Sequence, residues 1–335
     1  MPRFFRTLRW PILFIALSAA AVTLSAQVFS LKLVSTAWSP FTNAPGQPRF
    51  AIDLVETALG RIKMTATTTI VEASQFTPSL LSGPYDGSAA AWKDAEREKL
   101  LLFSQPYLEN RLILVGRKGT NVRMSSLGEL RGKRIAIVGG YAYGDIDNSG
   151  PVFVRTQSDE DSLTQLLQSK VDYTLMDDLV IQFLATNYAK ESQTRLELGI
   201  TPMVTRPLFF VVRRSRPDAE ILISRFNAEL RGLIKDRTYH KLMHVDWIRA
   251  DIDGDGVPED VPFSDKAGEA APQRVYSLKL PNTSLTAKEI AVSPRFYLGG
   301  TIYTDWASVP NRYKVEDPLK PSSAKNTASV FKFVW

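Results

Sequence analysis

The sequence predicts an α/β protein of two lobes joined by crossover strands, followed by a β-rich C-terminal extension. Three observations support this prediction. Strand-type and helix-type hydrophobic patterns alternate from residue 31 to residue 235, which favours mainly parallel sheets covered by helices. Two extended stretches, 111–115 and 208–212, interrupt the alternation, and we interpret them as crossovers between the lobes. Beyond Trp247 the composition shifts to turn residues and short strands.

Residues 1–26 have the pattern of an export signal. Arg3, Arg6 and Arg9 form a positive start without acidic residues, and an apolar run follows over 10–22. Small residues suited to cleavage come next. The alternative is an uncleaved membrane anchor, but the run is short for a span of about 20 residues. We therefore expect a cleaved leader and a mature chain that is exported and soluble.

The first set of elements begins directly after this signal. We expect a strand over 31–36, an amphipathic helix over 50–61 and a strand over 68–71. The segment from Asp86 to Arg97 is predicted to form a short buried strand, a turn and the start of a helix. A strand over 112–115, which ends at a glycine, then leaves this lobe.

The second set repeats the alternation of strands and helices. Its predicted elements are helix 125–130, strand 134–138, strand 152–155, helix 160–169, strand 173–176 and helix 179–185. The chain then returns along 208–212 and completes the first lobe with a helix over 217–235. Leu222, Phe226 and Leu230 share one face of that helix.

These patterns divide the chain into six segments. The predicted boundaries are a signal peptide over 1–26, the first part of lobe 1 over 27–113, lobe 2 over 114–204, the return to lobe 1 over 205–248, an acidic loop over 249–264 and a β-rich extension over 265–335. The sequence leaves the role of the extension open, because its aromatic residues fit either packing on lobe 1 or a surface for a partner.

Composition excludes several classes of function. The chain has no cysteine, which rules out thiol catalysis, iron–sulfur clusters and zinc–thiolate sites. The formal net charge is +6, half of it in the predicted leader, and the basic residues are scattered along the chain. Nucleic-acid binding needs a concentrated basic surface. We therefore expect a monomer with no nucleic-acid partner.

Two polar positions are candidate anchors for a ligand. Arg97 is placed near the start of a helix, and its guanidinium can grip a carboxylate with two parallel hydrogen bonds. The apolar strand over 171–176 ends in Asp177 and Asp178, whose carboxylates can hold an ammonium group. The alternatives are a surface ion pair for Arg97 and a helix cap for Asp177. Together the two anchors suit capture of a zwitterion such as an amino acid.

Five further segments occur in a characteristic order. They are Trp38-Ser39-Pro40-Phe41, Asp86 to Arg97, Phe103-Ser104-Gln105-Pro106-Tyr107, Leu130-Arg131-Gly132-Lys133-Arg134-Ile135-Ala136-Ile137 and Val171 to Asp177. In this order they resemble the periplasmic substrate-binding proteins of the polar amino-acid class, extracellular solute-binding family three. The resemblance covers about Leu31 to Val245. It implies a two-lobed periplasmic-binding-protein-like fold of type II with two crossover strands, and a ligand enclosed between the lobes by a hinge motion.

The resemblance also implies site residues. Arg97 matches the arginine that binds the ligand carboxylate, and Asp177 matches the aspartate that binds its ammonium group. Trp38 matches the aromatic residue that covers the ligand, and Phe41 belongs to the same loop. The alternative for Trp38 is a packing role only.

The sequence departs from the family pattern at two places. Relatives that bind amino acids usually place hydroxyl residues beside the arginine, where this chain has three alanines and Trp92. In the glycine loop of lobe 2, Tyr141 stands where a small hydroxyl residue is usual. We count Trp92 and Tyr141 as candidate ligand contacts, and they indicate a ligand that is larger, more apolar or differently shaped.

The acidic loop is a separate signal. It carries carboxylates at positions one, three, five and nine of a calcium-loop pattern: Asp251, Asp253, Asp255 and Glu259. A glycine at position six allows the sharp turn that such loops need. Position twelve is Pro262, so Asp260 or a backbone carbonyl would have to replace the usual bidentate glutamate. The pattern predicts a structural Ca²⁺ and no other cofactor; the alternative is a solvated acidic turn.

These observations predict a non-enzymatic periplasmic binding protein. It would capture a small carboxylate-bearing ligand, either an amino acid or a related zwitterion or organic acid, and deliver it to an inner-membrane ABC permease. One alternative is a sensory or accessory binding protein whose extension docks on a receptor or an enzyme. Another is a dehydratase-like enzyme on the same scaffold, with Asp94, Asp177 or Asp178 as acid or base.

Overall fold

The computed structural model describes residues 29–187, 194–243, 245–272, 275–277 and 294–315 of the 335-residue chain. The predicted signal peptide lies outside the described residues. Within the described residues, no helix has the length and apolar character needed to cross a membrane.

The described elements follow one another in an order that first alternates strands with helices and then ends in short strands. They are β1 (Phe29–Thr36), α1 (Phe50–Arg61), β2 (Met64–Val71), α2 (Ala73–Ser82), β3 (Gly87–Ala91), α3 (Ala95–Leu100), β4 (Leu101–Phe103), β5 (Leu108–Arg117), the 3₁₀ turn η1 (Leu127–Leu130), β6 (Arg134–Val138), β7 (Val152–Thr156), α4 (Asp159–Leu167), β8 (Tyr173–Asp177), α5 (Asp178–Asn187), β9 (Leu196–Arg213), α7 (Ala219–Lys235), α8 (Thr238–Met243), β10 (Trp247–Ala250), β11 (Glu259–Pro262), β12 (Tyr276–Ser277), β13 (Arg295–Leu298), β14 (Thr301–Tyr303) and η2 (Asn311–Tyr313).

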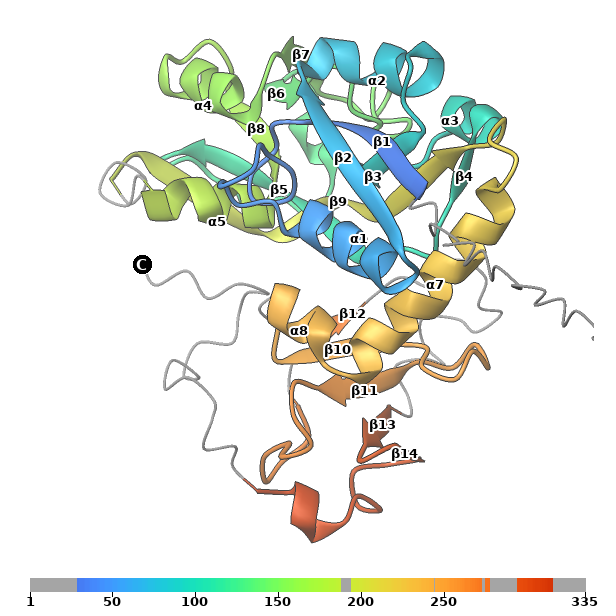
Figure 1. Ribbon diagram of the computed structural model, residues 1–335. Helices are drawn as coiled ribbons and strands as arrows, with labels where there is room; N and C mark the ends of the chain where they lie inside the picture. Colours follow the sequence, from blue (N-terminus) through green and yellow to red (C-terminus); the bar gives the residue numbers. More distant parts are fainter. Residues whose placement is uncertain (1–28, 188–193, 244, 273–274, 278–293, 316–335) are drawn as a thin grey trace, which may run out of the picture.

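The long strand β9 joins two groups of strands into one sheet. Within the described residues this sheet has nine strands, in the order β2-β1-β3-β9-β5-β8-β6-β7, with β4 also paired to β9. The C-terminal part of β9 pairs with β3 and β4, and the rest pairs with β5. We use lobe 1 for β1–β4 with α1–α3, α7 and α8, and lobe 2 for β6–β8 with α4 and α5 (Figure 1).

The parallel pairing predicted from the alternation is present inside each lobe. In lobe 1, β1 is parallel to β2 and β3, and in lobe 2, β6 is parallel to β7 and β8. The joining strands β5 and β9 run antiparallel to their neighbours. The ends of β1, β3 and β6 therefore deliver their following loops to the region between the lobes.

One predicted helix differs in kind from the observed element, and one observed helix was not predicted. The segment predicted as a helix over 125–130 forms only the 3₁₀ turn η1, because Gly128 lies inside this short stretch and Gly132 follows it, which leaves too few residues for a stable α-helix. The helix α2 was not predicted. Its Pro78 and its many polar residues conceal a helical spacing of Phe76 and Leu80, which are both buried.

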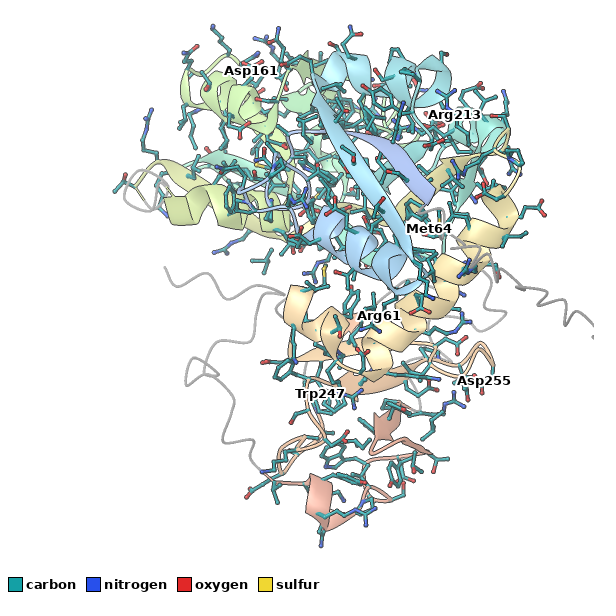
Figure 2. All side chains as sticks on the ribbon, viewed as in Figure 1. Arg61, Met64, Asp161, Arg213, Trp247 and Asp255 are labelled. Carbon is teal, nitrogen blue, oxygen red and sulfur yellow. The ribbon has the colours of Figure 1, made fainter. Side chains whose placement is uncertain are left out.

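Helix packing encloses the core of lobe 1. The predicted face of α7, formed by Leu222, Phe226 and Leu230, is buried as expected. Arg61 at the end of α1 pairs with Asp236, which follows α7, at 2.7 Å (Figure 2). This ion pair ties the end of α1 to the α7–α8 corner.

A second, smaller sheet lies beyond α7 and α8. Its order within the described residues is β12-β10-β11-β13-β14, and Figure 1 shows it on the side of these helices away from the nine-stranded sheet. Ile248 and Val261 from β10 and β11 belong to the main core, whereas Trp247 and Phe296 belong to a separate aromatic cluster. The predicted β-rich C-terminal region is therefore present, and its first strands are packed on lobe 1.

Candidate ligand-binding site

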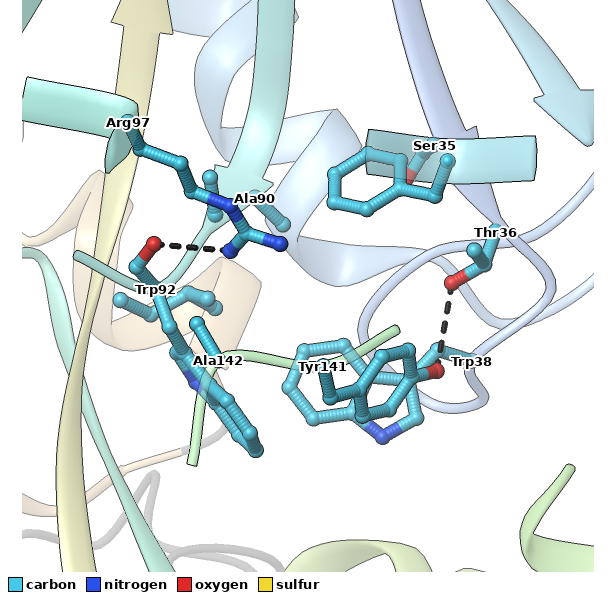
Figure 3. A pocket seen from close by; sticks show the side chains of 11 residues that line it. Ser35, Thr36, Trp38, Ala90, Trp92, Arg97, Tyr141 and Ala142 are labelled. Carbon is cyan, nitrogen blue, oxygen red and sulfur yellow. Dashed lines mark hydrogen bonds between the residues drawn. The ribbon is translucent and has the colours of Figure 1, made fainter. Parts of the chain in front are cut away.

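A cavity lies where the loops after β1 and β3 meet the loop after β6. Its free space, including the part open to solvent, is about 310 Å³. Both lobes contribute to its walls, as Figure 3 shows. The lining residues are Ser35, Thr36, Trp38, Phe76, Ala90, Ala91, Trp92, Arg97, Tyr141, Ala142 and Leu208.

Arg97 projects into this cavity from the first turn of α3. Asp94 caps that helix by accepting a hydrogen bond from the Arg97 backbone N–H at 2.8 Å. Only 3% of the arginine is exposed. Burial lowers the pKa of its guanidinium from the ordinary value, and Asp94 partly offsets this effect. An arginine side chain stays charged under such conditions, so the cavity contains a buried positive charge.

Protein atoms occupy part of the hydrogen-bonding capacity of this guanidinium. Nη1 donates to the Trp92 carbonyl at 2.9 Å (Figure 3), and Nη2 donates to Thr77 Oγ1 at 2.9 Å. Nη2 also donates to the Gly140 carbonyl of lobe 2, at the longer distance of 3.3 Å. The ion-pair alternative is correct in part, because Arg97 Nε lies 3.4 Å from Asp94 Oδ2, but the guanidinium is buried and is not a surface group.

Aromatic rings form a wall of the cavity. Trp38 and Trp92 meet edge to face with ring centroids 5.5 Å apart, and the ring of Tyr141 lies 5.6 Å from the first and 5.7 Å from the second. The Tyr141 hydroxyl is 3.3 Å from Thr36 Oγ1 across the two lobes (Figure 3). Three of the residues singled out by the sequence therefore meet beside Arg97.

The loop after β6 closes against lobe 1. The Gly140 carbonyl accepts a hydrogen bond from Thr77 Oγ1 as well as from Arg97. Gly140 has a φ of +83°, and a Cβ there would lie 2.9 Å from the Ala73 carbonyl oxygen. This position needs glycine, because any side chain would push the loop away from α2.

Helix α2 supplies two site residues that sequence reasoning missed. Phe76 lines the cavity, and its ring centroid lies 5.6 Å from the central carbon of the Arg97 guanidinium. Thr77 accepts a hydrogen bond from the same guanidinium. The buried spacing of Phe76 and Leu80 would have indicated the helix, but nothing local indicated its contact with Arg97.

Asp177 lies behind the cavity wall rather than on it. Its carboxylate accepts hydrogen bonds from Asn110 Nδ2, from the Arg111 backbone N–H and from the Leu179 backbone N–H, at 2.9, 3.1 and 2.9 Å. Asn110 in turn accepts from the Trp92 indole N–H at 2.8 Å. Burial raises the pKa of Asp177 well above its ordinary value, and its neighbour Asp178 adds to the rise.

Phe41 is also away from the lining residues. It is fully buried, and its ring packs against Trp38 with centroids 4.3 Å apart. Phe41 therefore supports the loop that presents Trp38 to the cavity.

The acidic loop connects β10 and β11, which Figure 1 shows on the other side of α7 and α8 from β1, β3 and β6. Ligand oxygens of Asp251, Asp253 and Glu259 all lie within 4.8 Å of one another. Burial raises the pKa of Glu259 to about 7. Asp260, which the sequence offered as a substitute ligand, instead pairs with Arg249 through both oxygens, at 2.5 and 2.8 Å.

Arg295 of β13 brings a positive charge to the same loop. It donates to both oxygens of Asp255, at 2.8 and 3.0 Å, to the Val257 carbonyl at 2.6 Å, and to Glu259. These bonds attach β13 to the β10–β11 hairpin. The acidic loop therefore helps to connect the strands of the small sheet through its bonds to the Arg295 guanidinium.

The chain is similar to several known binding proteins. It is 26% identical to the ABC transporter arginine-binding protein 1 of Escherichia coli (strain K12) over 221 residues, which are 62% of this chain and 86% of that relative. An arginine 3rd transport system periplasmic binding protein from Legionella pneumophila has a similar structure, with a TM-score of 0.54 at 23% identity over 64% of this chain and 98% of that chain.

A receptor fragment shares the same fold. The GluR0 ligand-binding core from Nostoc punctiforme, in complex with L-glutamate, matches with a TM-score of 0.53 at 21% identity, over 63% of this chain and 96% of that chain. At such identities the two structural matches establish the fold of this chain.

Residues 33–249 match the family of bacterial extracellular solute-binding proteins, family 3. This match spans more than half of the chain and includes both lobes, the cavity and Arg97. The family is described as solute-binding proteins, and this favours a binding protein over the dehydratase-like alternative. The chain belongs to family 3 of the bacterial extracellular solute-binding proteins.

Proposed function

We propose that this protein captures a small carboxylate-bearing ligand between its two lobes. The observation that carries the proposal is the buried Arg97 guanidinium, which is directed into a cavity lined by both lobes. A ligand that contacts both walls binds the closed arrangement more tightly than an open one, and so favours closure by a hinge motion. The joining strands β5 and β9 are where such a hinge would act.

The partner of the closed form is proposed to be an inner-membrane ABC permease. The support comes from the relative in Escherichia coli, which is described as an arginine-binding protein of an ABC transporter. The sequence of residues 1–26 supports export to the periplasm, where such a protein would act as a monomer.

Within the cavity, we propose that Arg97 binds the carboxylate while Trp38, Trp92 and Tyr141 contact the rest of the ligand. Their positions around one space support these roles. Phe41 would act through Trp38, against which it packs.

The test removes the guanidinium without leaving a cavity at its position. Arg97→Met keeps the side-chain volume and removes the charge, and its matched control is Arg155→Met, an arginine on β7 that pairs with Asp147 and is half exposed. Loss of a buried charged partner costs about 2–5 kcal/mol, so affinity for a carboxylate should fall at least 30-fold in the first variant and stay unchanged in the control.

The measurement is a thermal-shift screen of amino acids and organic acids, followed by calorimetry of the compounds that stabilise the wild type. Native mass spectrometry of the freshly purified protein identifies any ligand that the protein retains, and this compound is then included in the screen. A carboxylate that binds Arg97→Met as tightly as the wild type would contradict the anchor role, and a screen without any stabilising carboxylate would contradict the function.

For the acidic loop we propose Ca²⁺ binding by Asp251, Asp253, Asp255 and Glu259, in a structural role. The close approach of three of these carboxylates supports the proposal. Arg295 would compete with the ion, because its guanidinium bonds to two of the same side chains.

Calorimetric titration with Ca²⁺ tests this second proposal, with Mg²⁺ as the comparison ion. The wild type should bind Ca²⁺ at millimolar concentration, Asp253→Asn should bind more weakly, and Arg295→Gln should bind about tenfold more tightly because a competing positive charge is removed. Absence of a Ca²⁺ heat in both the wild type and Arg295→Gln would remove the proposal.

A further inference from the structure

We infer that the preferred ligand is a small monocarboxylate that has an apolar body and no ammonium group. This inference rests on the proposed function and narrows it to a substrate class. Four features of the cavity and its surroundings support it: the charge of the lining, the free donors of Arg97, the position of Asp177 and the nature of the walls.

The charge of the lining favours an anion. Among the described residues that line the cavity, Arg97 is the one charged side chain, and none is acidic. The other polar lining groups are the hydroxyls of Ser35, Thr36 and Tyr141, which can donate to a carboxylate oxygen. Asp94, which does not line the cavity, pairs with Arg97 at 3.4 Å and offsets part of the buried charge. A bound monocarboxylate would add to this compensation, whereas a zwitterion would also bring a positive charge close to the guanidinium.

The donors of Arg97 define where the carboxylate would sit. Nη1 uses one of its two N–H groups for the Trp92 carbonyl, so the other remains for a ligand. On Nη2, the longest bond is the one to the Gly140 carbonyl at 3.3 Å, compared with 2.9 Å to Thr77. A carboxylate oxygen is a stronger acceptor than this carbonyl. The ligand would therefore replace the Gly140 carbonyl and form a two-pronged bond across Nη1 and Nη2.

None of the lining residues that the structure describes has a carboxylate that could hold an ammonium group. The carboxylate of Asp177 is 2% exposed, and both of its oxygens already accept hydrogen bonds from the protein. The Trp92 indole N–H donates to Asn110, and Asn110 donates to Asp177. Trp92 and Asn110 therefore lie between the Asp177 carboxylate and the cavity. An ammonium group in the cavity would lose its water without gaining a carboxylate partner.

The walls favour a small apolar body. Phe76, Trp38, Trp92 and Leu208 surround the space next to the guanidinium. The free space of about 310 Å³ includes the part that is open to solvent, so the enclosed part is smaller and suits a small ligand. The indoles and Tyr141 meet edge to face, so their faces are partly covered by one another and do not form an open cage for a cation.

The test compares ligands that differ only in the α-amino group. The probes are 3-phenylpropanoate with L-phenylalanine, and pentanoate with L-norvaline, titrated by calorimetry into the mature wild-type chain. We expect the carboxylic acid of at least one pair to bind tenfold or more tightly than its amino acid, and Arg97→Met to lose that binding while Arg155→Met keeps it.

Each outcome decides the inference. Suppose that the amino acids bind as tightly as the carboxylic acids or more tightly, and that Asp177→Asn, with a native circular dichroism spectrum, loses this binding. This result would overturn the inference and leave carboxylate capture by Arg97 intact. Equal or tighter binding that Asp177→Asn does not affect would also overturn it. If neither member of either pair binds, the ligand class is wrong, and the broader screen of carboxylates decides separately whether the proposed function stands.

Discussion

Asp159 begins helix α4, at a position where a carboxylate is normally favoured by the helix dipole. Its side chain is nevertheless only 9% exposed, and burial raises its pKa from 3.8 to about 7, with a further contribution from Glu160. The field of Asp159 also contributes to the raised pKa of Tyr141 and Tyr143, so it lies close to the loop that closes the cavity.

The raised pKa of Asp159 has a defined effect on stability. The folded protein holds this proton up to about pH 7, whereas the unfolded chain loses it near pH 3.8. The stabilisation is therefore fully present below pH 3.8 and is lost as the pH rises to about 7, by roughly 4 kcal/mol in total.

Asp159→Asn removes this titration. The free energy of unfolding of the variant, relative to the wild type, should increase by about 2.6 kcal/mol between pH 5 and pH 8. Denaturant unfolding at both pH values measures it, and Asp161→Asn in the same helix turn controls for the loss of an acidic side chain. A difference that stays constant with pH would show that Asp159 ionises normally in the folded protein.

Strand β3 shows how one element determines the position of the site. It carries Ala90 and Ala91 of the cavity wall and leads directly into Trp92 and the helix of Arg97. At its first residue, Gly87, a Cβ would lie 1.9 Å from the carbonyl oxygen of Val211 in β9. The strand can pair with β9 at this distance only because Gly87 has no side chain.

Gly87→Ala should therefore destabilise the protein by about 2 kcal/mol or more, because the clash is with backbone and not with a movable side chain. The matched control is Gly60→Ala in α1, where a Cβ meets no atom within 4 Å and a gain of up to about 1 kcal/mol is expected. Thermal unfolding of both variants makes the comparison. Equal stability of the two would show that β3 and β9 can separate without loss.

At the scale of the whole molecule, the loop after β6 forms contacts between the two lobes, in addition to the joining strands β5 and β9. Gly140 bonds to Thr77 and Arg97, and Tyr141 bonds to Thr36. A ligand that replaces the Gly140 carbonyl on Arg97 would keep the lobes together through its own contacts with both walls. The small C-terminal sheet is packed behind lobe 1, on the far side of α7 and α8, so it leaves this contact region free (Figure 1).

The sequence alone determined most of the elements and their order, although helix α2 and strand β4 were missed. Helix α1 and strand β6 have the predicted bounds, and the buried face of α7 is the predicted one. Local hydrophobic spacing is sufficient for this, because burial of one face is what stabilises each element. The segment around Arg97 was identified in the same way, from a buried strand followed by a capped helix.

Tertiary structure decided which polar residues face the ligand space. Arg97 and Asp177 both follow apolar strands and are almost equally buried, yet the first points into the cavity and the second is covered by Asn110 and Trp92. Likewise, the carboxylates of the acidic loop bond to Arg295, which is forty residues away from Asp255. These outcomes depend on pairings between residues distant in sequence, and no local pattern encodes how such pairs satisfy one another's hydrogen bonds and charges.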